Sequence, residues 1–198
     1  AVGRSALGAN SIGAQNTAVG SLALVANQTA SNNTAVGYIA LTSSTTATQN
    51  VAVGQAALEG LTTGHDNTAV GRAALNNNDT SANNTAVGSS ALLLATSGNN
   101  TVVGAFAADA ITTGSEITAV GVNALTNMSG ESFSVAVGSS AGLYATGERN
   151  TFMGRATGIG NSGGASGANN TAIGNEALAD FTTGSSNTAV GKMALKSL

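Results

Sequence analysis

Apolar and polar residues follow one another in a short pattern that recurs along the whole chain. Its core reads Asn-Thr-Ala-Val-Gly-x-x-Ala-Leu, and a polar stretch that often contains Thr-Thr-Gly completes it. The glycine occurs twelve times, with eight of the eleven spacings equal to seventeen residues, at Gly3, Gly20, Gly37, Gly54, Gly71, Gly88, Gly104, Gly121, Gly138, Gly154, Gly174 and Gly191. A fixed short period of this kind predicts a solenoid, in which each repeat forms one coil stacked on the coil before it.

The residue before each glycine is valine in ten coils, and β-branched residues favour strands. The period is too short for helical repeats, and the apolar spacing lacks a helical rhythm. We therefore predict an all-β, parallel β-solenoid (β-roll) of about twelve coils, with one strand ending at the glycine and a second over the Ala-Leu pair. The first strand and its glycine are marked by Val19 and Gly20, Val36 and Gly37, Val53 and Gly54, Val70 and Gly71, Val87 and Gly88, Val120 and Gly121, and Val190 and Gly191.

The repeat glycine suits a corner at which φ is positive or a neighbouring backbone comes close. An asparagine opens the strand in nine coils, for example at Asn33 and Asn50. Asparagine tolerates left-handed backbone geometry, and stacked side-chain amides can hydrogen-bond from one coil to the next. Within the strand, Thr and Val share one face while Ala and Gly share the other, and this alternation leaves open which face lies inside the coil.

The strand that ends at the glycine carries no charged residue in any coil. A solitary solenoid would turn one face of this strand to water and would be expected to place charge there. The charged residues lie instead in the connecting stretches or directly after the glycine, as Arg4, Arg72, Arg155 and Lys192 do. We therefore expect one strand face to pack inside its own coil and the other against sister chains, most simply around a threefold axis.

Composition agrees with a thin interior of small side chains. The 198 residues include 27 glycines, no tryptophan and no cysteine, and only 8% of them are charged. The net charge of −3, without a Lys/Arg cluster, argues against nucleic-acid or anionic-membrane binding. No apolar run approaches the length of about eighteen residues that a membrane span requires. We expect no disulfide, no thiolate metal site and no membrane insertion in this segment.

Residues that commonly carry chemistry are few and scattered. The segment 158–163 matches the dinucleotide fingerprint G-x-G-x-x-G, but no helix follows it, and we assign it to a flexible loop. His65 and Asp66 are adjacent but have no nucleophile beside them. Carboxylates occur singly, at Glu59, Asp66, Asp79, Glu116, Glu131 and Glu148. The aromatic residues occupy different coil positions and are assigned to local packing: Tyr38, Phe106, Phe133, Tyr144, Phe152 and Phe181. We expect no catalytic site, no metal and no cofactor, and therefore no enzyme.

The repeat, which runs from Thr17-Ala18-Val19-Gly20 to Thr188-Ala189-Val190-Gly191, resembles the head repeats of YadA-like trimeric autotransporter adhesins. It resembles still more closely the repeats found upstream of endosialidase-type intramolecular chaperone domains in phage tail fibres and bacterial surface fibres. The resemblance implies a left-handed parallel β-roll, a homotrimer, and an extracellular location on a cell surface or a virion. The coils here are nearer to seventeen residues than to the fourteen of the adhesin head.

We expect a single β-solenoid domain over residues 1–198. The longest spacing, twenty residues between Gly154 and Gly174, indicates a loop insertion near residues 160–168. The chain begins inside the motif, at Ala1-Val2-Gly3, as an excerpt of a longer fibre would.

Three functions are compatible with the repeat. The favoured one is a structural or adhesive segment of a trimeric fibre, which presents or forms a host-attachment surface for a cell-surface glycan or protein. The second is ice binding by an exposed Thr-x-Val ladder, formed by Thr17, Thr34, Thr68, Thr85, Thr101, Thr118, Thr151, Thr171 and Thr188. The third is a tail-fibre depolymerase that acts on surface polysaccharide. Oligomeric state separates the first function from the second, because only a monomer leaves the threonine ladder exposed.

Overall fold

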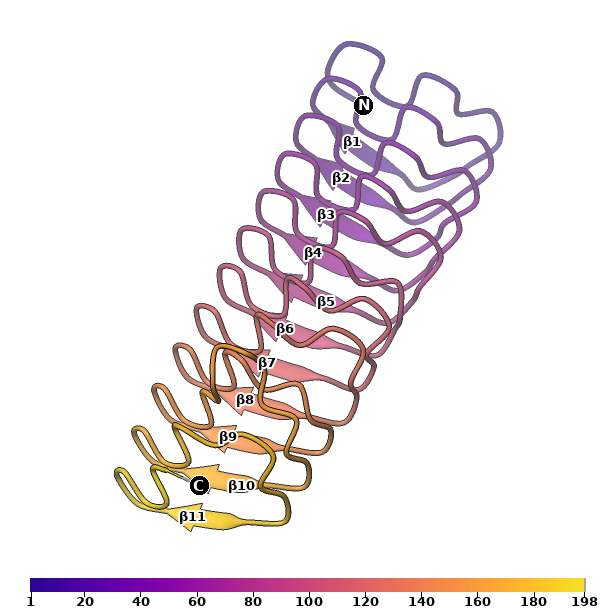
Figure 1. The fold of residues 1–198 in the computed structure, drawn as a ribbon. Coiled ribbons are helices and arrows are strands. Elements are labelled where there is room, and N and C mark those ends of the chain that lie inside the picture. The colour runs from indigo at the N-terminus through magenta and orange to yellow at the C-terminus, as the bar shows by residue number, and fades with distance from the viewer. Residues whose placement is uncertain (198) are drawn as a thin grey trace.

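The computed structural model describes residues 1–197, which form one continuous stack of coils (Figure 1). Eleven strands of three residues each make a single sheet, in which every strand pairs in parallel with the next along the chain. The strands are β1 (Thr17–Val19), β2 (Thr34–Val36), β3 (Val51–Val53), β4 (Thr68–Val70), β5 (Thr85–Val87), β6 (Thr101–Val103), β7 (Thr118–Val120), β8 (Val135–Val137), β9 (Thr151–Met153), β10 (Thr171–Ile173) and β11 (Thr188–Val190). The predicted all-β, parallel β-solenoid is confirmed.

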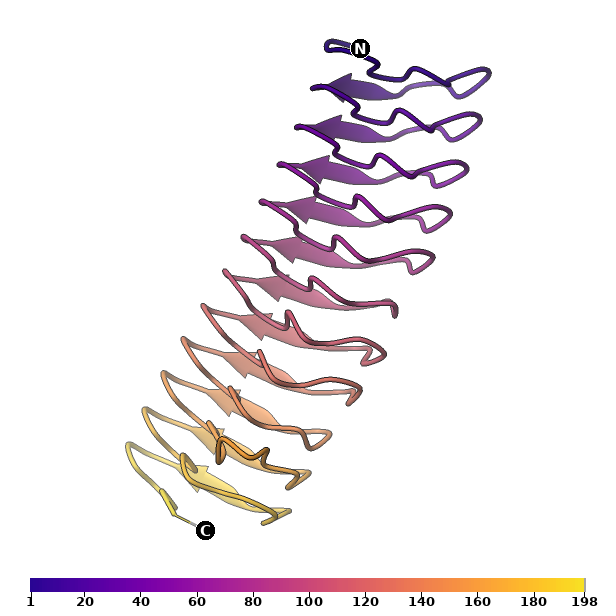
Figure 2. The same ribbon diagram turned by 45° about the horizontal axis from the view of Figure 1, so that its top comes forward.

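Equivalent positions of successive coils lie directly beside one another. Thr17 pairs with Thr34 and Val19 with Val36, and this register continues to β11. The first repeat has no named strand, but its Val2 forms an isolated bridge to Val19. Neighbouring strands lie about 4.8 Å apart, so the eleven strands extend over about 48 Å. Figure 2 shows the strands in a row along the rod, with the rest of each coil looping away from them.

The second predicted strand, over the Ala-Leu pair, is wrong. This stretch is a run of turns in which the second and fourth residues after the glycine have positive φ, as at Ile39 (52°) and Leu41 (50°). The amide of Ile39 donates to Ser21 O in the preceding coil (3.0 Å). The amide of Leu41 donates to Ala57 O in the following coil (2.9 Å). This backbone turns two consecutive apolar side chains inwards, whereas consecutive side chains in a strand point to opposite faces.

Alanine, at the middle of the strand, points into the coil. In the coil of β2, Ala35, Ala40 and Leu41 have no exposed surface, and the same three positions are buried in most other coils. The interior therefore consists of columns of small and medium apolar side chains that run the length of the rod, each stabilised by removal from water. The strand face with Ala lies inside, and the face with Thr and Val lies outside.

Two features predicted for the repeat glycine are both present. Gly71 has a φ of +137°, a conformation that residues with a side chain rarely adopt. A Cβ atom on Gly71 would lie 2.4 Å from the carbonyl oxygen of Gly88 in the next coil. The glycine is therefore required both by the corner itself and by the close approach of the coil stacked on it.

The six aromatic residues differ in burial. Phe152 and Phe181 are fully buried, and their ring centroids lie 5.9 Å apart. Tyr38, Phe106 and Phe133 are each about half exposed and Tyr144 is half-buried, so the predicted local packing is confirmed for Phe152 and Phe181. Arg149 lies over the Phe133 ring, 5.4 Å from its centroid, which is within the range of a cation–π contact.

The extra residues between Gly154 and Gly174 form a short excursion from the coil. The amide of Gly164 donates to Asn161 O (2.8 Å) and closes a turn, and Ala165 returns to the stack through a parallel bridge to Ala145. The segment 158–163 thus passes from the coil interior into this turn, and no helix follows it. The geometry of a dinucleotide site, in which a helix start faces the pyrophosphate, is not formed by this motif.

Candidate interaction surface

The outer face of the sheet consists of two columns of side chains. The threonine column holds the first residue of each strand, and the valine column holds the third. The middle residue of every strand is buried, whereas the two flanking residues are half-buried or exposed. The valine column includes Val103, Ile173 and Met153, which are 38%, 39% and 45% exposed. A long apolar and hydroxyl-bearing face is therefore open to the surroundings of a single chain.

The residues of the predicted threonine ladder all lie in the threonine column, and none of them is buried: Thr17, Thr34, Thr68, Thr85, Thr101, Thr118, Thr151, Thr171 and Thr188. Val51 and Val135 take the place of threonine in β3 and β8. The valines that define the repeat likewise lie outwards, in the valine column. The ladder thus exists as a nearly continuous row, interrupted by two residues of similar shape.

Charged side chains flank this face on both sides. The position after each repeat glycine forms the basic edge, where four of the six Lys and Arg residues are exposed: Arg4, Arg72, Arg155 and Lys192. The two positions before the strand-opening asparagine form the acidic edge, which contains Asp66, Glu116 and Glu148. Arg149 also lies on the acidic edge, where it pairs with Glu148 at 2.9 Å. The face is therefore uncharged in the middle and carries opposite net charge along its two edges.

The basic edge was recognised from the sequence, but the acidic edge was not. The sequence does contain a signal for the acidic edge, because Asp66 and Glu116 both stand five residues before their repeat glycine. That spacing places the two carboxylates on the outer side only if the Thr and Val face of the strand lies outwards. The alternation of residues along the strand does not show which face lies outwards.

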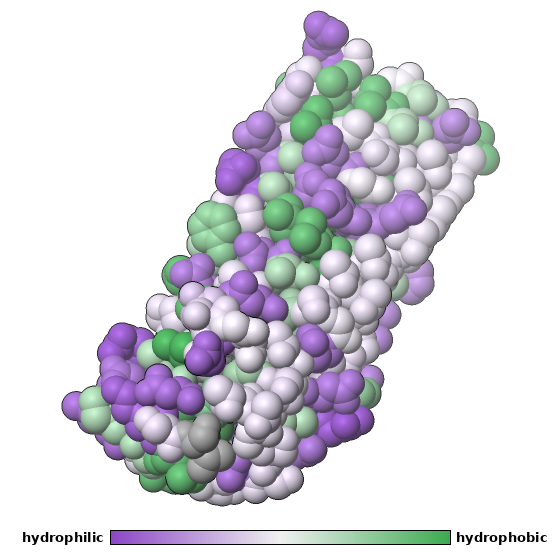
Figure 3. Space-filling model, in the orientation of Figure 1, coloured by the Kyte–Doolittle hydropathy of each residue, from purple (hydrophilic) through white to green (hydrophobic). Residues whose placement is uncertain are grey.

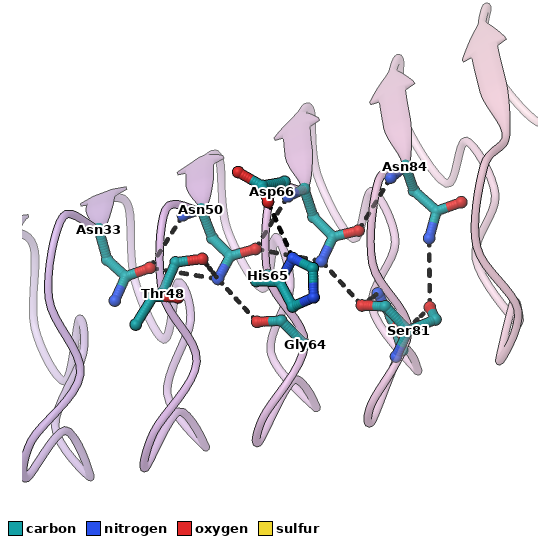
Figure 4. Close-up of polar contacts among 10 residues, drawn as sticks. Asn33, Thr48, Asn50, Gly64, His65, Asp66, Ser81 and Asn84 are labelled. Carbon is teal, nitrogen blue, oxygen red and sulfur yellow. Dashed lines mark hydrogen bonds and ion pairs between the residues drawn. The ribbon is translucent and has the colours of Figure 1, made fainter.

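A ladder of buried asparagines runs directly behind the acidic edge (Figure 4). The backbone amide of Asn50 donates to Asn33 Oδ1 (2.9 Å), and the backbone amide of Asn67 donates to Asn50 Oδ1 (3.0 Å). The Asn50 side chain also donates to Gly64 O (3.0 Å). The predicted coil-to-coil bonding is confirmed, and it holds successive strands in register.

The left-handed geometry predicted for these asparagines is wrong. Positive φ occurs one residue earlier, for example at Gln49 (61°) and Asp66 (56°), and this turn directs the following asparagine inwards. Ile117 and Ser134 interrupt the ladder in two successive coils. The backbone amide of Ile117 still donates to Asn100 Oδ1 (3.0 Å), so the bond from the coil before Ile117 is kept. Ile117 has no side-chain oxygen of its own to accept a bond from the coil that follows.

The described titratable groups form exposed ion pairs: Arg155 and Lys196 both pair with Glu176, at 2.8 and 3.7 Å. His65 Nδ1 lies 2.8 Å from Asp66 Oδ2, and both side chains are about half exposed (Figure 4). Glu131 accepts the amides of Ser129 and Gly130 (2.9 Å each), so it serves the local turn. No described group of His, Asp and Glu is arranged to hold a metal ion, and no pocket opens among residues 1–197. On the side of the rod drawn in Figure 3, hydrophilic and hydrophobic side chains occur in small groups along the whole length.

The surroundings of Asp109 alter the acidity of its carboxyl group. Burial raises the pKa of Asp109 above its usual value, while the backbone amides of Asp109 and Ala110 act in the opposite direction without cancelling the effect. Its Oδ1 is buried and has no hydrogen-bond partner among the described residues. A carboxyl group whose pKa differs between the folded and unfolded chain makes stability depend on pH.

The described residues include no helix that could cross a membrane. Comparison with known proteins finds no family model, no curated protein and no solved structure that matches this chain.

Proposed function

We propose that this chain is a structural or adhesive segment of a trimeric extracellular fibre, on a cell surface or a virion. The observation that carries the proposal is the outer sheet face, which is long, regular and uncharged, and which a single chain leaves in contact with water. Large exposed apolar patches on a protein surface mark interaction sites. Stacking coils along one axis also produces a rod, the shape that a fibre segment needs.

The size of the face is sufficient for a stable interface. From the acidic to the basic edge it spans six residue steps, or about 20 Å, and its length is about 48 Å. The product is about 1,000 Å² for each chain, which two neighbours share in a trimer, compared with the roughly 800 Å² that each chain of a standard interface buries. Thr and Val lose little side-chain entropy on burial, which favours association through them.

The partners in this proposal are two further copies of the same chain and a host cell-surface glycan or protein. The sister copies cover the sheet face, so the host partner is left with the connecting loops on the other sides of the rod. The resemblance to adhesin-head and tail-fibre repeats supports this division of roles. A catalytic role has no comparable support, because Glu131 is engaged by backbone amides and Glu148 by Arg149.

The experiment that tests the proposal is a measurement of molar mass in solution by light scattering on the intact chain. We expect three times the chain mass of 18.9 kDa, independent of protein concentration over the micromolar range. A mass of one chain over the same range would overturn the trimeric fibre.

A second function, ice binding, is favoured by one specific observation. The threonine column is outward and in register from coil to coil, so a monomer would offer a regular array of hydroxyl and methyl groups. The decisive measurement is thermal hysteresis of freezing on a sample shown to be monomeric. Ice binding requires hysteresis that Thr85→Lys removes and that Thr63→Lys, at an exposed threonine outside the column, retains. Absence of hysteresis in the monomer would exclude it.

A further inference from the structure

We propose that copies of this chain pack edge to edge in a fixed register, so that the basic edge of one copy meets the acidic edge of the next at the level of the same coil. In this arrangement Arg72 lies against Asp66 of the next copy, and the threonine and valine columns point towards the common axis. The inference rests on the proposed trimer and adds the faces, the order and the register of its contacts.

Side chains alternate between the outside and the interior across the face. Within one coil, the residues at five, three and one positions before the glycine and the residue directly after it all avoid the interior. In the coil of β4 these residues are Asp66, Thr68, Val70 and Arg72, and none of them is buried. The two residues that alternate with the first three, Asn67 and Ala69, have no exposed surface. Each coil therefore offers four outward side chains, with the two edge positions farthest apart.

The two edges carry net charge of opposite sign, and in the coil of β4 a cation and a carboxylate stand at the same level, Arg72 on the basic edge and Asp66 on the acidic edge. The basic edge has four cations and no anion, whereas the acidic edge has three carboxylates and one arginine, which is paired with Glu148. Contact between like edges would place Arg72 against Arg72, which is unfavourable, whereas contact between unlike edges at the same level pairs Arg72 with Asp66. Arg72 is exposed and makes no ion pair within residues 1–197. Its guanidinium group is therefore free for a carboxylate of another copy.

Rotational symmetry fixes the register. A threefold axis parallel to the rod relates the copies by rotation without translation along the axis. Residues of the same coil then remain at the same height in every copy. Asp66 lies two residues before β4 and Arg72 two residues after it, in the same coil, so the rotation brings Arg72 of one copy to the level of Asp66 of the next. The three contacts are equivalent and close the ring.

Engineered cysteines test this arrangement directly, because the chain has no cysteine of its own. Gln49 and Gln55 occupy the acidic-edge and basic-edge positions of the β3 coil, and both are exposed. Within one chain the extended strand β3 lies between them, and its three residues alone span about 10 Å, which is beyond the roughly 7 Å that a disulfide spans between Cα atoms. Any disulfide in the double variant Gln49→Cys/Gln55→Cys must therefore join two copies.

We expect mild oxidation of this double variant to give a covalent trimer on a denaturing, non-reducing gel. Each single variant should give uncrosslinked chains. The control pair Gln49→Cys/Ser89→Cys, whose second cysteine lies two coils further along the basic edge, should give little product. Light scattering before oxidation reports the native mass of the same samples.

The outcomes separate this inference from the proposed function. A native trimer in which the matched pair fails to crosslink overturns the edge-to-edge contact and leaves the fibre proposal standing. Equal crosslinking by the control pair overturns the register. A covalent product no larger than two chains overturns the threefold arrangement, and a native mass of one chain overturns the inference and the proposed function together.

Discussion

Gly158 lies against Phe152 at a point where other coils have leucine and alanine. Phe152 occupies the middle of β9, a position that holds alanine in nine of the eleven strands. Gly158 stands four residues after its repeat glycine, where most coils have leucine. A Cβ atom on Gly158 would lie 2.3 Å from two carbon atoms of the Phe152 ring. In this coil the strand residue is large and the turn residue is small, whereas most coils have a small strand residue and a large turn residue. The filled volume of the interior is thus kept.

The first prediction is that these two positions are energetically coupled. Phe152→Ala should lower the free energy of unfolding by about 3–5 kcal/mol, because it leaves a cavity. Gly158→Leu alone should also destabilise, because the side chain has no space beside the ring. The double variant restores the usual pair, and leucine accepts the backbone there, since Leu24 has a φ of 51° and Gly158 one of 56°. A double-mutant cycle by chemical denaturation should show that the double variant is more stable than the sum of the two changes allows. Simple additivity would contradict the exchange.

The second prediction concerns the corner glycine. Gly71→Ala places a Cβ atom 2.4 Å from backbone of the next coil and requires an unfavourable φ, so we expect a loss of more than about 4 kcal/mol. Gly163→Ala is the matched control, because its nearest neighbour would be a side-chain oxygen of Asn161 at 3.7 Å. The control should change stability by less than about 0.5 kcal/mol. Thermal unfolding followed by circular dichroism compares the two variants, and equal losses would show that the corner is not the cause.

The third prediction concerns the asparagine ladder. Asn67→Ala removes the side-chain oxygen that accepts the backbone amide of Asn84 (3.0 Å) and the side-chain nitrogen that donates to Ser81 O (2.9 Å). Each buried group left unpaired costs about 1–3 kcal/mol. Asn77→Ala, at an exposed asparagine outside the ladder, should be almost neutral. Hydrogen exchange should also become faster at the Asn84 amide in the ladder variant, and unchanged exchange there would mean that the amide has another partner.

Much of this fold follows from the sequence because the repeat imposes the same demands twelve times. The glycine corner, the asparagine ladder and the uncharged strand each depend on the residue type at fixed positions of the repeat. The same residue types recur at these positions in coil after coil, so the pattern is easily recognised. The conformation of the Ala-Leu stretch had no such signal. Positive φ is unusual for a residue such as Leu41, and here it is stabilised by hydrogen bonds to the coils on both sides, which no local pattern reveals.

The interaction surface was harder to predict than the fold for a related reason. Thr and Val favour strands on either face, so their alternation with alanine does not identify the interior. The volume exchange between Phe152 and Gly158 does identify it, because two residues compensate in size only when both point into the same core. That pattern is visible in the sequence once the repeats are aligned, although it occurs in few coils.

The fourth prediction uses the raised pKa of Asp109. A carboxyl group whose pKa is higher in the folded chain than in the unfolded one binds its proton more tightly when folded. Stability should therefore improve as pH falls from neutrality through the raised pKa, and level off below the ordinary carboxyl value. Asp109→Asn removes the charge and should raise the melting temperature at pH 7, with a smaller advantage in acid. Melting curves of both proteins over this pH range check the prediction, and a pH-independent difference would contradict it.

The fifth prediction is that the two edges of the sheet face recognise each other by charge. Asp66→Arg and Arg72→Asp each place like charges opposite one another in the proposed trimer, so each should weaken association at low salt. The combined Asp66→Arg/Arg72→Asp chain restores opposite charges and should recover most of the lost affinity. An exposed ion pair contributes about 0.2–1 kcal/mol, and the trimer contains three equivalent pairs.

Sedimentation equilibrium at low and high salt measures this recovery. High salt screens exposed charges, so the difference between the single and combined variants should shrink as salt is added. Asp79→Arg is the matched control, because Asp79 is exposed but belongs to neither edge. Circular dichroism establishes that every variant keeps its coils. If both single reversals weaken association and the combined chain is weaker still, the two residues act independently and the pairing of Arg72 with Asp66 across copies is wrong.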